Sequence, residues 1–307
     1  MRALSVAAVA LAFVVVVFGA YVRLSDAGLG CPDWPMCHGR PVPAEIADAA
    51  ALGKAWKEMG HRYLAGTLGL LIAALAGAAW RSRRSPRLAL AIVVLVVLQA
   101  TLGMWTVTML LRPAIVTAHL AGGMTTLALL AWLALSQFEH RRDPATRAVR
   151  GWAAVALGAV AIQILLGGWV SANYAALACP DLPLCCGRVL PPMDFANAFH
   201  VVRELGQTAD GALLSNEALT AIHWTHRVFA LVAVSAALVA ALRAWTVLRP
   251  IALAAALLAV LQFSLGVANV ALSLPLPLAA AHNAGAALLL LSLVVLNFFS
   301  FSGLRFP

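Results

Sequence analysis

Four histidines stand out in this sequence of 307 residues, because each lies near one end of a long apolar stretch. His61 and His119 belong to the first half of the chain, and His226 and His282 belong to the second. A polar side chain inside a bilayer is energetically costly, so an intramembrane histidine usually has a partner. For a single histidine, a hydrogen bond to a neighbouring helix would be a sufficient explanation. Four histidines that recur in pairs instead predict ligands of a bound group.

The chemistry that suits these pairs is haem binding. Two imidazoles on facing helices of a four-helix bundle can hold a haem iron from both sides, with the porphyrin between the helices. A zinc or copper site would need further ligands, and the sequence offers no third histidine or thiolate at that depth. The residue types therefore predict one haem site in each half, with all four histidines as iron ligands.

Charged residues flank these histidines unequally in the two halves. Arg62 and Arg227 directly follow a histidine, where they could extend to lipid phosphate or pair with haem propionates. Glu58 lies one helical turn before His61 on the same face, and a carboxylate there could act as a base or stabilise positive charge. The alternative is a solvated glutamate at the membrane interface. Because the second half has His223 at this position, we expect the chemistry in the first half.

Five cysteines follow a repeated frame. Cys31 and Cys37, like Cys179 and Cys185, occupy the pattern C-P-D-x-P-x-C in segments predicted to face an oxidising compartment. A disulfide within each segment is predicted, although spacing does not settle whether Cys185 or the adjacent Cys186 pairs with Cys179. Two interpretations stay open, a structural staple for a proline-rich loop and a redox-active pair above the first haem.

The elements that must position these residues are membrane helices. Apolar residues make up 63% of the chain and charged residues 11%, which is far from the balance of a water-soluble domain. Eight stretches of roughly 18–25 residues can cross a hydrocarbon core about 30 Å thick. They are residues 3–22, 63–80, 88–111, 114–135, 152–172, 218–242, 251–272 and 278–299.

An internal repeat relates the two halves. Residues 19–37 match residues 167–185 without a gap, and three later blocks around the histidines match in the same order. A duplicated four-helix unit explains this, and it makes the first apolar stretch part of the fold, not a cleaved signal peptide. We therefore expect an all-α integral membrane protein with two pseudo-symmetric four-helix bundles in parallel tandem repeat, comprising residues 1–145 and 146–307.

The distribution of charge predicts the orientation. With the N-terminus inside, the inner segments hold twelve arginines and two acidic residues, whereas the outer segments hold nine basic and ten acidic residues. The positive-inside rule then places both termini in the cytoplasm and the cysteine loops outside. The net charge of +9 thus reflects topology, and no recognition motif indicates a nucleic-acid partner. The long outer loops, 24–57 and 173–217, could form short interfacial helices within 43–59 and 193–205.

These features together resemble the haem A synthase family. The resemblance rests on E-x-x-H-R at residues 58–62, the later His119, the repeated His226-Arg227 and His282, and the paired cysteines. It implies an oxidoreductase that converts the C8 methyl group of haem O to the formyl group of haem A through a hydroxymethyl intermediate, for cytochrome oxidase assembly. The setting implied is the bacterial cytoplasmic membrane.

The resemblance also implies roles for individual residues. His61 and His119 would hold haem O, with Glu58 beside the reacting carbon, whereas His226 and His282 would ligate a haem b cofactor. Cys31 and Cys37 would take part in redox exchange. Haem O synthase is the expected substrate donor, and a membrane compound such as quinone is a candidate electron acceptor. The sequence is compatible with a homo-oligomer and does not identify the acceptor, the oxygen source or the oligomeric state.

Two other functional classes fit parts of the pattern. A di-haem electron carrier between quinone and a periplasmic partner would also use four histidines, and Glu58 would then be incidental. A quinone-linked membrane thiol oxidoreductase would use the cysteine pairs and need no haem. An optical spectrum distinguishes the thiol oxidoreductase from the haem proteins, and product analysis distinguishes the carrier from the synthase.

Overall fold

The computed structural model describes residues 1–307 except residues 44, 45, 47, 306 and 307. Within the described residues, eight helices are long and apolar enough to cross a membrane. They are α1 (Arg2–Leu24), α2 (Ala49–Ser82), α3 (Pro86–Thr108), α4 (Pro113–Leu135), α5 (Arg150–Ala172), α7 (Asn216–Ala244), α8 (Arg249–Ala271) and α9 (Leu276–Ser302). The predicted all-α membrane fold is confirmed, and the predicted spans coincide with these helices apart from their ends.

Local sequence explains where several helices begin. The Asp48 carboxylate accepts a hydrogen bond from the backbone N–H of Ala50 at the start of α2, and the Ser215 hydroxyl accepts one from Ala218 at the start of α7. Such caps satisfy backbone donors that have no partner within the helix. Pro86 and Pro113 stand in the first turns of α3 and α4, where a missing N–H carries no penalty.

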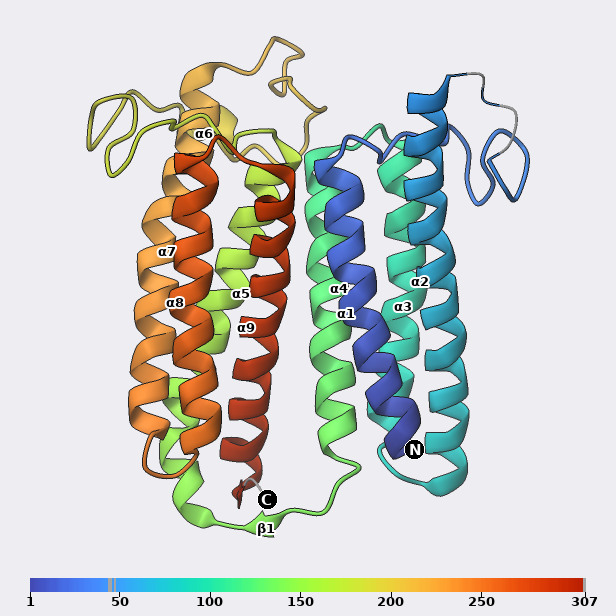
Figure 1. The fold of residues 1–307 in the computed structure, drawn as a ribbon, viewed down its shortest axis with the longest axis vertical. Helices are drawn as coiled ribbons and strands as arrows, with labels where there is room; N and C mark the ends of the chain where they lie inside the picture. The colour runs from blue at the N-terminus through green and yellow to red at the C-terminus, as the bar shows by residue number, and fades with distance from the viewer. Residues whose placement is uncertain (44–45, 47, 306–307) are drawn as a thin grey trace.

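The helices form two groups in chain order. Figure 1 shows α1–α4 on one side of the molecule and α5, α7, α8 and α9 on the other. Contacts of α9 with α1 and α4, and of α4 with α5, join the groups. Among the eight spans, α9 is the most enclosed by protein. The remaining spans expose much of their apolar surface, as expected for helices surrounded by lipid.

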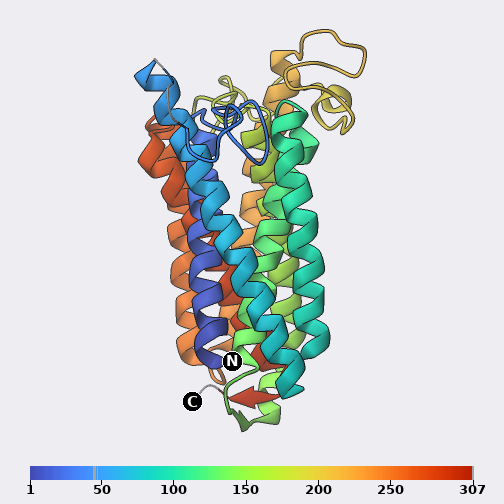
Figure 2. The ribbon, with the colours of Figure 1, turned by 90° about the vertical axis from the view of Figure 1, so that its right-hand side faces the viewer.

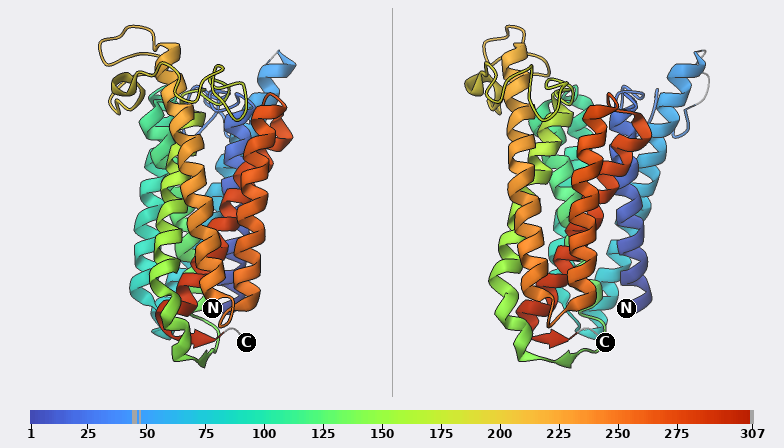
Figure 3. Two further views of the ribbon diagram at one scale, coloured as in Figure 1. Left: turned by 90° about the vertical axis from the view of Figure 1, so that its left-hand side faces the viewer. Right: turned by 60° about the vertical axis from the view of Figure 1, so that its left-hand side comes forward.

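Both long loops lie at one end of the helices and both described chain ends lie at the other (Figures 1 and 3). At the end away from the loops, the link between the groups pairs with the C-terminus. The two-residue strands β1 (Arg141–Arg142) and β2 (Leu304–Arg305) are antiparallel, and the 3-10 helix η1 (Pro144–Val149) follows. The Thr146 hydroxyl donates to the Phe299 carbonyl at 3.2 Å. The last turn of α9 is thereby tied to the start of the second group.

The expected interfacial helices differ from the structure. Residues 49–59 do not form a separate helix; they are the first turns of α2, which rises beyond the neighbouring helices in Figure 2. The part of that prediction at residues 44, 45 and 47 lies outside the described residues. In the second loop, only α6 (Phe195–Ala198) is helical. The continuous α2 places Glu58 and His61 on one rigid element.

We predict that the loops face outward, and Cys186 offers a direct test because its thiol is free and exposed. A membrane-impermeant maleimide added to intact cells should label the wild-type protein, since the positive-inside rule places this loop outside. A Cys186→Ser variant should stay unlabelled. Labelling that occurs only after the membrane is permeabilised would contradict the orientation.

Candidate functional site

The four predicted ligands occupy comparable places on four helices. His61 lies on α2, His119 on α4, His226 on α7 and His282 on α9. Each falls within roughly the first four turns of a helix that begins at the long-loop end. The two histidines of each half are close enough to interact electrostatically. The structure therefore places the four histidines in the two pairs that the sequence predicts, and their ligation of iron stays a prediction.

Each imidazole packs against a glycine of an adjacent helix. The pairs are Gly19 with His61, Gly103 with His119, Gly167 with His226 and Gly266 with His282. A Cβ atom at Gly19 would lie 2.7 Å from Cε1 of His61, and the other three glycines would bring it to 3.1–3.3 Å of the facing ring. A larger side chain would displace the rings. These glycines therefore let the rings lie directly against the neighbouring backbone.

The donor set fits haem. Nδ1 of His61 and Nδ1 of His119 are buried and have no hydrogen-bond partner among the described residues. Buried polar atoms are normally paired, so the unpaired nitrogens show that these two rings are not engaged by protein side chains and are available to a ligand. Within the same part of the chain, no three His, Cys, Asp or Glu side chains converge as a metal site. Two imidazoles without a third donor suit axial ligation of a porphyrin iron.

Glu58 is buried, with 5% of its surface exposed. One carboxylate oxygen accepts a hydrogen bond from the backbone N–H of Cys31 at 2.8 Å, and the other pairs with the Arg62 guanidinium at 2.5 Å. The alternative interpretation of a solvated interfacial glutamate is therefore wrong. The same side chain reaches the disulfide loop and lies one turn from His61.

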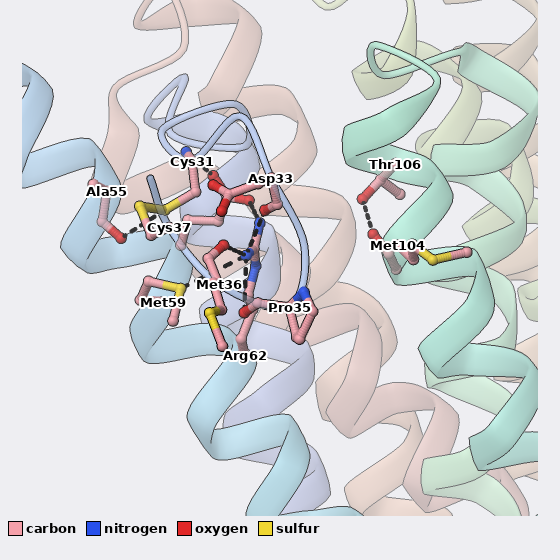
Figure 4. A network of polar contacts seen from close by, with 12 residues as sticks. Cys31, Asp33, Pro35, Met36, Cys37, Ala55, Met59, Arg62, Met104 and Thr106 are labelled. Carbon is pink, nitrogen blue, oxygen red and sulfur yellow. Dashed lines mark hydrogen bonds and ion pairs between the residues drawn. A yellow bond between two sulfur atoms is a disulfide. The ribbon is translucent and has the colours of Figure 1, made fainter. Parts of the chain in front are cut away.

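Arg62 binds the first cysteine loop. Its guanidinium donates to the carbonyl oxygens of Asp33 and Met36 at 2.9 and 2.7 Å (Figure 4). Arg227 likewise donates to Asp181 and Leu184 in the second loop, at 2.9 and 3.1 Å. Both arginines are therefore held by the loops, and extension to lipid phosphate is not tested by these contacts. Pairing with haem propionates stays a prediction, which would add a partner to these contacts.

In the second half, His223 makes the contact with the cysteine loop that Glu58 makes in the first half. Its Nδ1 accepts a hydrogen bond from the backbone N–H of Cys179 at 3.1 Å, and only 3% of the residue is exposed. Both side chains therefore hold the first cysteine of a loop. What differs is the charge, because Glu58 brings a carboxylate and an ion pair and His223 does not.

The two cysteine loops have the same internal structure. Cys31 bonds to Cys37, and Cys179 bonds to Cys185. The Asp33 carboxylate accepts from the backbone N–H groups of His38 and Gly39 at 2.6 and 2.8 Å. These bonds lower the pKa of Asp33, with the Gly39 N–H as the largest cause. They are therefore present at neutral pH and are lost only on acidification.

Asp181 explains why Cys186 stays out of the second disulfide. Its carboxylate accepts from the N–H groups of Cys186 and Gly187 at 2.6 and 2.8 Å. Cys186 thus takes the place of His38, with the same left-handed φ of 53°. Its thiol faces the carbonyl oxygen of Ala178. The alternative left open by spacing is thereby decided in favour of Cys185.

A family model described as cytochrome oxidase assembly protein matches residues 2–294. The chain belongs to this family. The heme A synthase of Shewanella oneidensis is 42% identical over 303 residues, covering 93% of this chain and 92% of the relative. The heme A synthase of Symbiobacterium thermophilum is 32% identical over 247 residues, or 74% and 76% of the two chains. That of Caulobacter vibrioides is 30% identical, covering 92% and 90%. The resemblance inferred from the motifs is thereby confirmed.

In this member of the cytochrome oxidase assembly family, sequence reasoning missed the glycines and a set of glutamines. Gln163 and Gln262 contact the rings of His226 and His282. A signal for them was present, because Q-x-x-x-G occurs at residues 99–103, 163–167 and 262–266. On a helix this spacing places both residues on one face. The pattern could have been recognised only by asking which residues face the histidines.

We predict that the disulfide pairing persists in the isolated, air-oxidised protein. Mass mapping without reductant should find Cys31 linked to Cys37 and Cys179 linked to Cys185, with Cys186 as the remaining thiol, because the Asp181 contacts hold Cys186 apart. A linkage of Cys179 to Cys186, or free thiols at Cys31 and Cys37, would contradict the assignment.

Proposed function

We propose that this protein is a haem A synthase, an oxidoreductase that converts the C8 methyl group of haem O to the formyl group of haem A through a hydroxymethyl intermediate. The product would serve cytochrome oxidase assembly. Membership of the cytochrome oxidase assembly family and relatives named heme A synthase support the proposal. The four half-buried histidines support it independently, because two pairs of imidazoles suit two porphyrins.

The observation that carries the assignment of the two halves is the exchange of Glu58 for His223 at one structural position. Both residues hold a cysteine loop, so the loop contact alone does not explain a carboxylate in the first half. The negative charge of Glu58 would serve catalysis if the methyl group of the substrate reacts beside it. We therefore assign residues 1–145 to the substrate haem O, held by His61 and His119, and residues 146–307 to a cofactor.

The cofactor proposed for the second half is haem b, with His226 and His282 as iron ligands. Haem b would supply one-electron transfer when bound. Arg62 and Arg227 are proposed to contact haem propionates at the loop end of each half, because cationic side chains pair strongly with carboxylates. Their present bonds to loop carbonyls would then connect a bound porphyrin to the loop above it.

Glu58 is the proposed catalytic carboxylate. Removal of two electrons and one proton from the methyl group, equivalent to a hydride, would leave a cationic carbon conjugated with the porphyrin, with the electrons passing finally to the proposed quinone acceptor and the oxygen of the hydroxymethyl group coming from water. A fixed carboxylate in an apolar site stabilises such a charge and can direct water toward the carbon. The ion pair with Arg62 and the bond from Cys31 hold Glu58 in place. Little reorganisation would then be needed during reaction.

We propose that Cys31 and Cys37 take part in redox exchange at the haem site of the first half. Their disulfide is buried and lies one hydrogen bond from Glu58, through the Cys31 N–H. The pair Cys179 and Cys185 has the same connection to His223. We propose haem O synthase as the substrate donor and a membrane compound such as quinone as the final electron acceptor. The proposed setting is a bacterial cytoplasmic membrane with both termini inside.

A Glu58→Gln variant tests the catalytic role. Glutamine keeps the size and the acceptor for the Cys31 N–H but removes the negative charge. Haem should stay bound, and conversion of haem O should fall by about 10²–10³-fold, as when other preorganised electrostatic groups are removed. The measurement is haem A formed per bound haem, by chromatography of extracted pigments.

The matched control is His223→Gln, which makes the corresponding change where no carboxylate is present. Turnover per bound haem should stay near normal in this variant. Equal, near-normal turnover in Glu58→Gln and His223→Gln would show that the difference between the halves is not catalytic. A purely structural role for Glu58 would instead lower expression and haem content together, with unchanged activity per haem.

The cofactor assignment predicts the effect of removing one iron ligand. His226→Ala or His282→Ala should abolish the low-spin haem b spectrum of the purified protein while the fold persists, because each leaves the iron with one protein ligand. Optical and electron paramagnetic resonance spectra measure this directly. A normal bis-histidine spectrum in both variants would contradict the assignment.

A further inference from the structure

The imidazoles of the second half are held by glutamine side chains. The Gln163 amide nitrogen lies 3.1 Å from Nδ1 of His226, and the Gln262 amide nitrogen lies 3.2 Å from Nδ1 of His282. Each amide nitrogen also lies 3.4 Å from Nε2 of the same ring, so both amides contact the ring near both of its nitrogens. Gln163 also donates to the backbone carbonyl of His226 at 3.1 Å. Both ring contacts are made from the helix that packs beside the histidine, and both come from Q-x-x-x-G segments.

The site is shaped to seat these glutamines. Each lies four residues before the glycine that faces the same histidine, so the amide and the glycine contact one ring from one helix face. The space for Gln262 is made by Gly285, where even a Cβ atom would clash with the amide. The amide oxygens of Gln163 and Gln262 are buried and have no hydrogen-bond partner among the described residues. They are free to accept a ring N–H if the amide rotates.

His61 in the first half lacks this arrangement, whereas it is kept in part around His119, where Gly103 faces the ring and Gly122 makes the space for Gln99. The residue that corresponds to Gln163 is Val15, which lies four residues before Gly19 on α1 and has no polar group. Nδ1 of His61 and Nδ1 of His119 have no hydrogen-bond partner in the described part of the chain. Gln99 corresponds to Gln262, but its amide nitrogen is also without a partner, although the His119 ring lies beside its backbone.

A second hydrogen bond on a metal-bound imidazole matters for two reasons. It fixes which ring nitrogen carries the proton, and it holds the ring in the orientation that the metal requires. An amide suits both states of the ring because it offers a donor and an acceptor of nearly the same shape. Loss of such a partner typically weakens metal binding by about 10–100-fold.

We propose that Gln163 and Gln262 are positioning residues that lock His226 and His282 onto a resident haem, and that Val15 leaves His61 unlocked so that the first half can exchange its haem. This inference rests on the proposed function, in which one porphyrin stays and the other enters as substrate and leaves as product. The difference lies in the residues facing the histidines, because the ligands themselves are the same in both halves.

The test removes the amides from the second half of the full-length, haem-loaded protein. In Gln163→Val and Gln262→Leu, transfer of haem b to excess apomyoglobin should be about 10–100-fold faster than in the wild type. The low-spin electron paramagnetic resonance signal of haem b should broaden, because the rings adopt a range of orientations. Gln99→Leu is the matched control, since it makes the same change in the first half, and it should leave the haem b transfer rate unchanged.

The reciprocal variant, Val15→Gln, supplies the missing amide opposite His61. Haem O bound in the first half should then transfer to apomyoglobin about 10-fold more slowly or slower still. This variant keeps the inference testable if Gln163→Val does not fold. Unchanged transfer rates and an unchanged signal in Gln163→Val and Gln262→Leu, or an unchanged rate in Val15→Gln, would overturn it.

The outcome also separates this inference from the proposed function. If the second half holds no haem b, pigment extracts of the wild-type protein will contain no haem b, whatever the first half binds, and both proposals fail. If the wild-type signal is present but insensitive to the glutamine substitutions, only the positioning role fails.

Discussion

The placing of four half-buried imidazoles among apolar helices is the constraint on which the rest of the structure depends. An imidazole in an apolar environment needs a partner for each ring nitrogen. The glycines at positions 19, 103, 167 and 266 bring a neighbouring helix close to each ring, but a glycine offers the ring no side-chain donor or acceptor. The iron of a porphyrin is therefore the partner that we propose for each pair, with the amides of Gln163 and Gln262 as additional contacts in the second half.

The cysteine loops are attached to this arrangement by charged and polar side chains that lie within three residues of His61 and His226. Arg62 and Arg227 hold loop carbonyls one residue after a histidine, and Glu58 and His223 hold the first cysteine three residues before it. Helices α2 and α7 thus each carry both an expected ligand and the anchors of a cysteine loop. Any movement of α2 that follows haem binding would reach the disulfide through Glu58 directly.

Much of the fold and the main site residues could be predicted from sequence because their signals are local or repeated. Apolar length identified the spans, and the repeat paired His61 with His226 and Glu58 with His223. The ion pair of Glu58 with Arg62 follows from their spacing of four residues on one helix. The burial of Glu58 could not be predicted, because Cys31 meets it only when the loop folds back over α2. The role of Gln163 was missed for the same reason, since its contact with His226 joins α5 to α7, far apart in sequence.

The pairing of Cys179 was left open because Cys185 and Cys186 are adjacent, and spacing alone favours neither. The deciding interaction is a hydrogen bond from the backbone N–H of Cys186 to the carboxylate of Asp181, which holds Cys186 in the turn. Helix boundaries were also imprecise at α2, whose first turns are polar on one side and resemble an interfacial helix. Only the capping contact of Asp48 with Ala50 and the burial of Glu58 reveal one continuous helix.

The most direct test of the central claim is the pigment content of the protein purified after co-expression with haem O synthase. The account predicts haem b together with haem A, formed from haem O, in acid-acetone extracts separated by chromatography. An extract that contains haem b and unconverted haem O without haem A or its hydroxymethyl precursor, from protein with an intact bis-histidine spectrum, would contradict it.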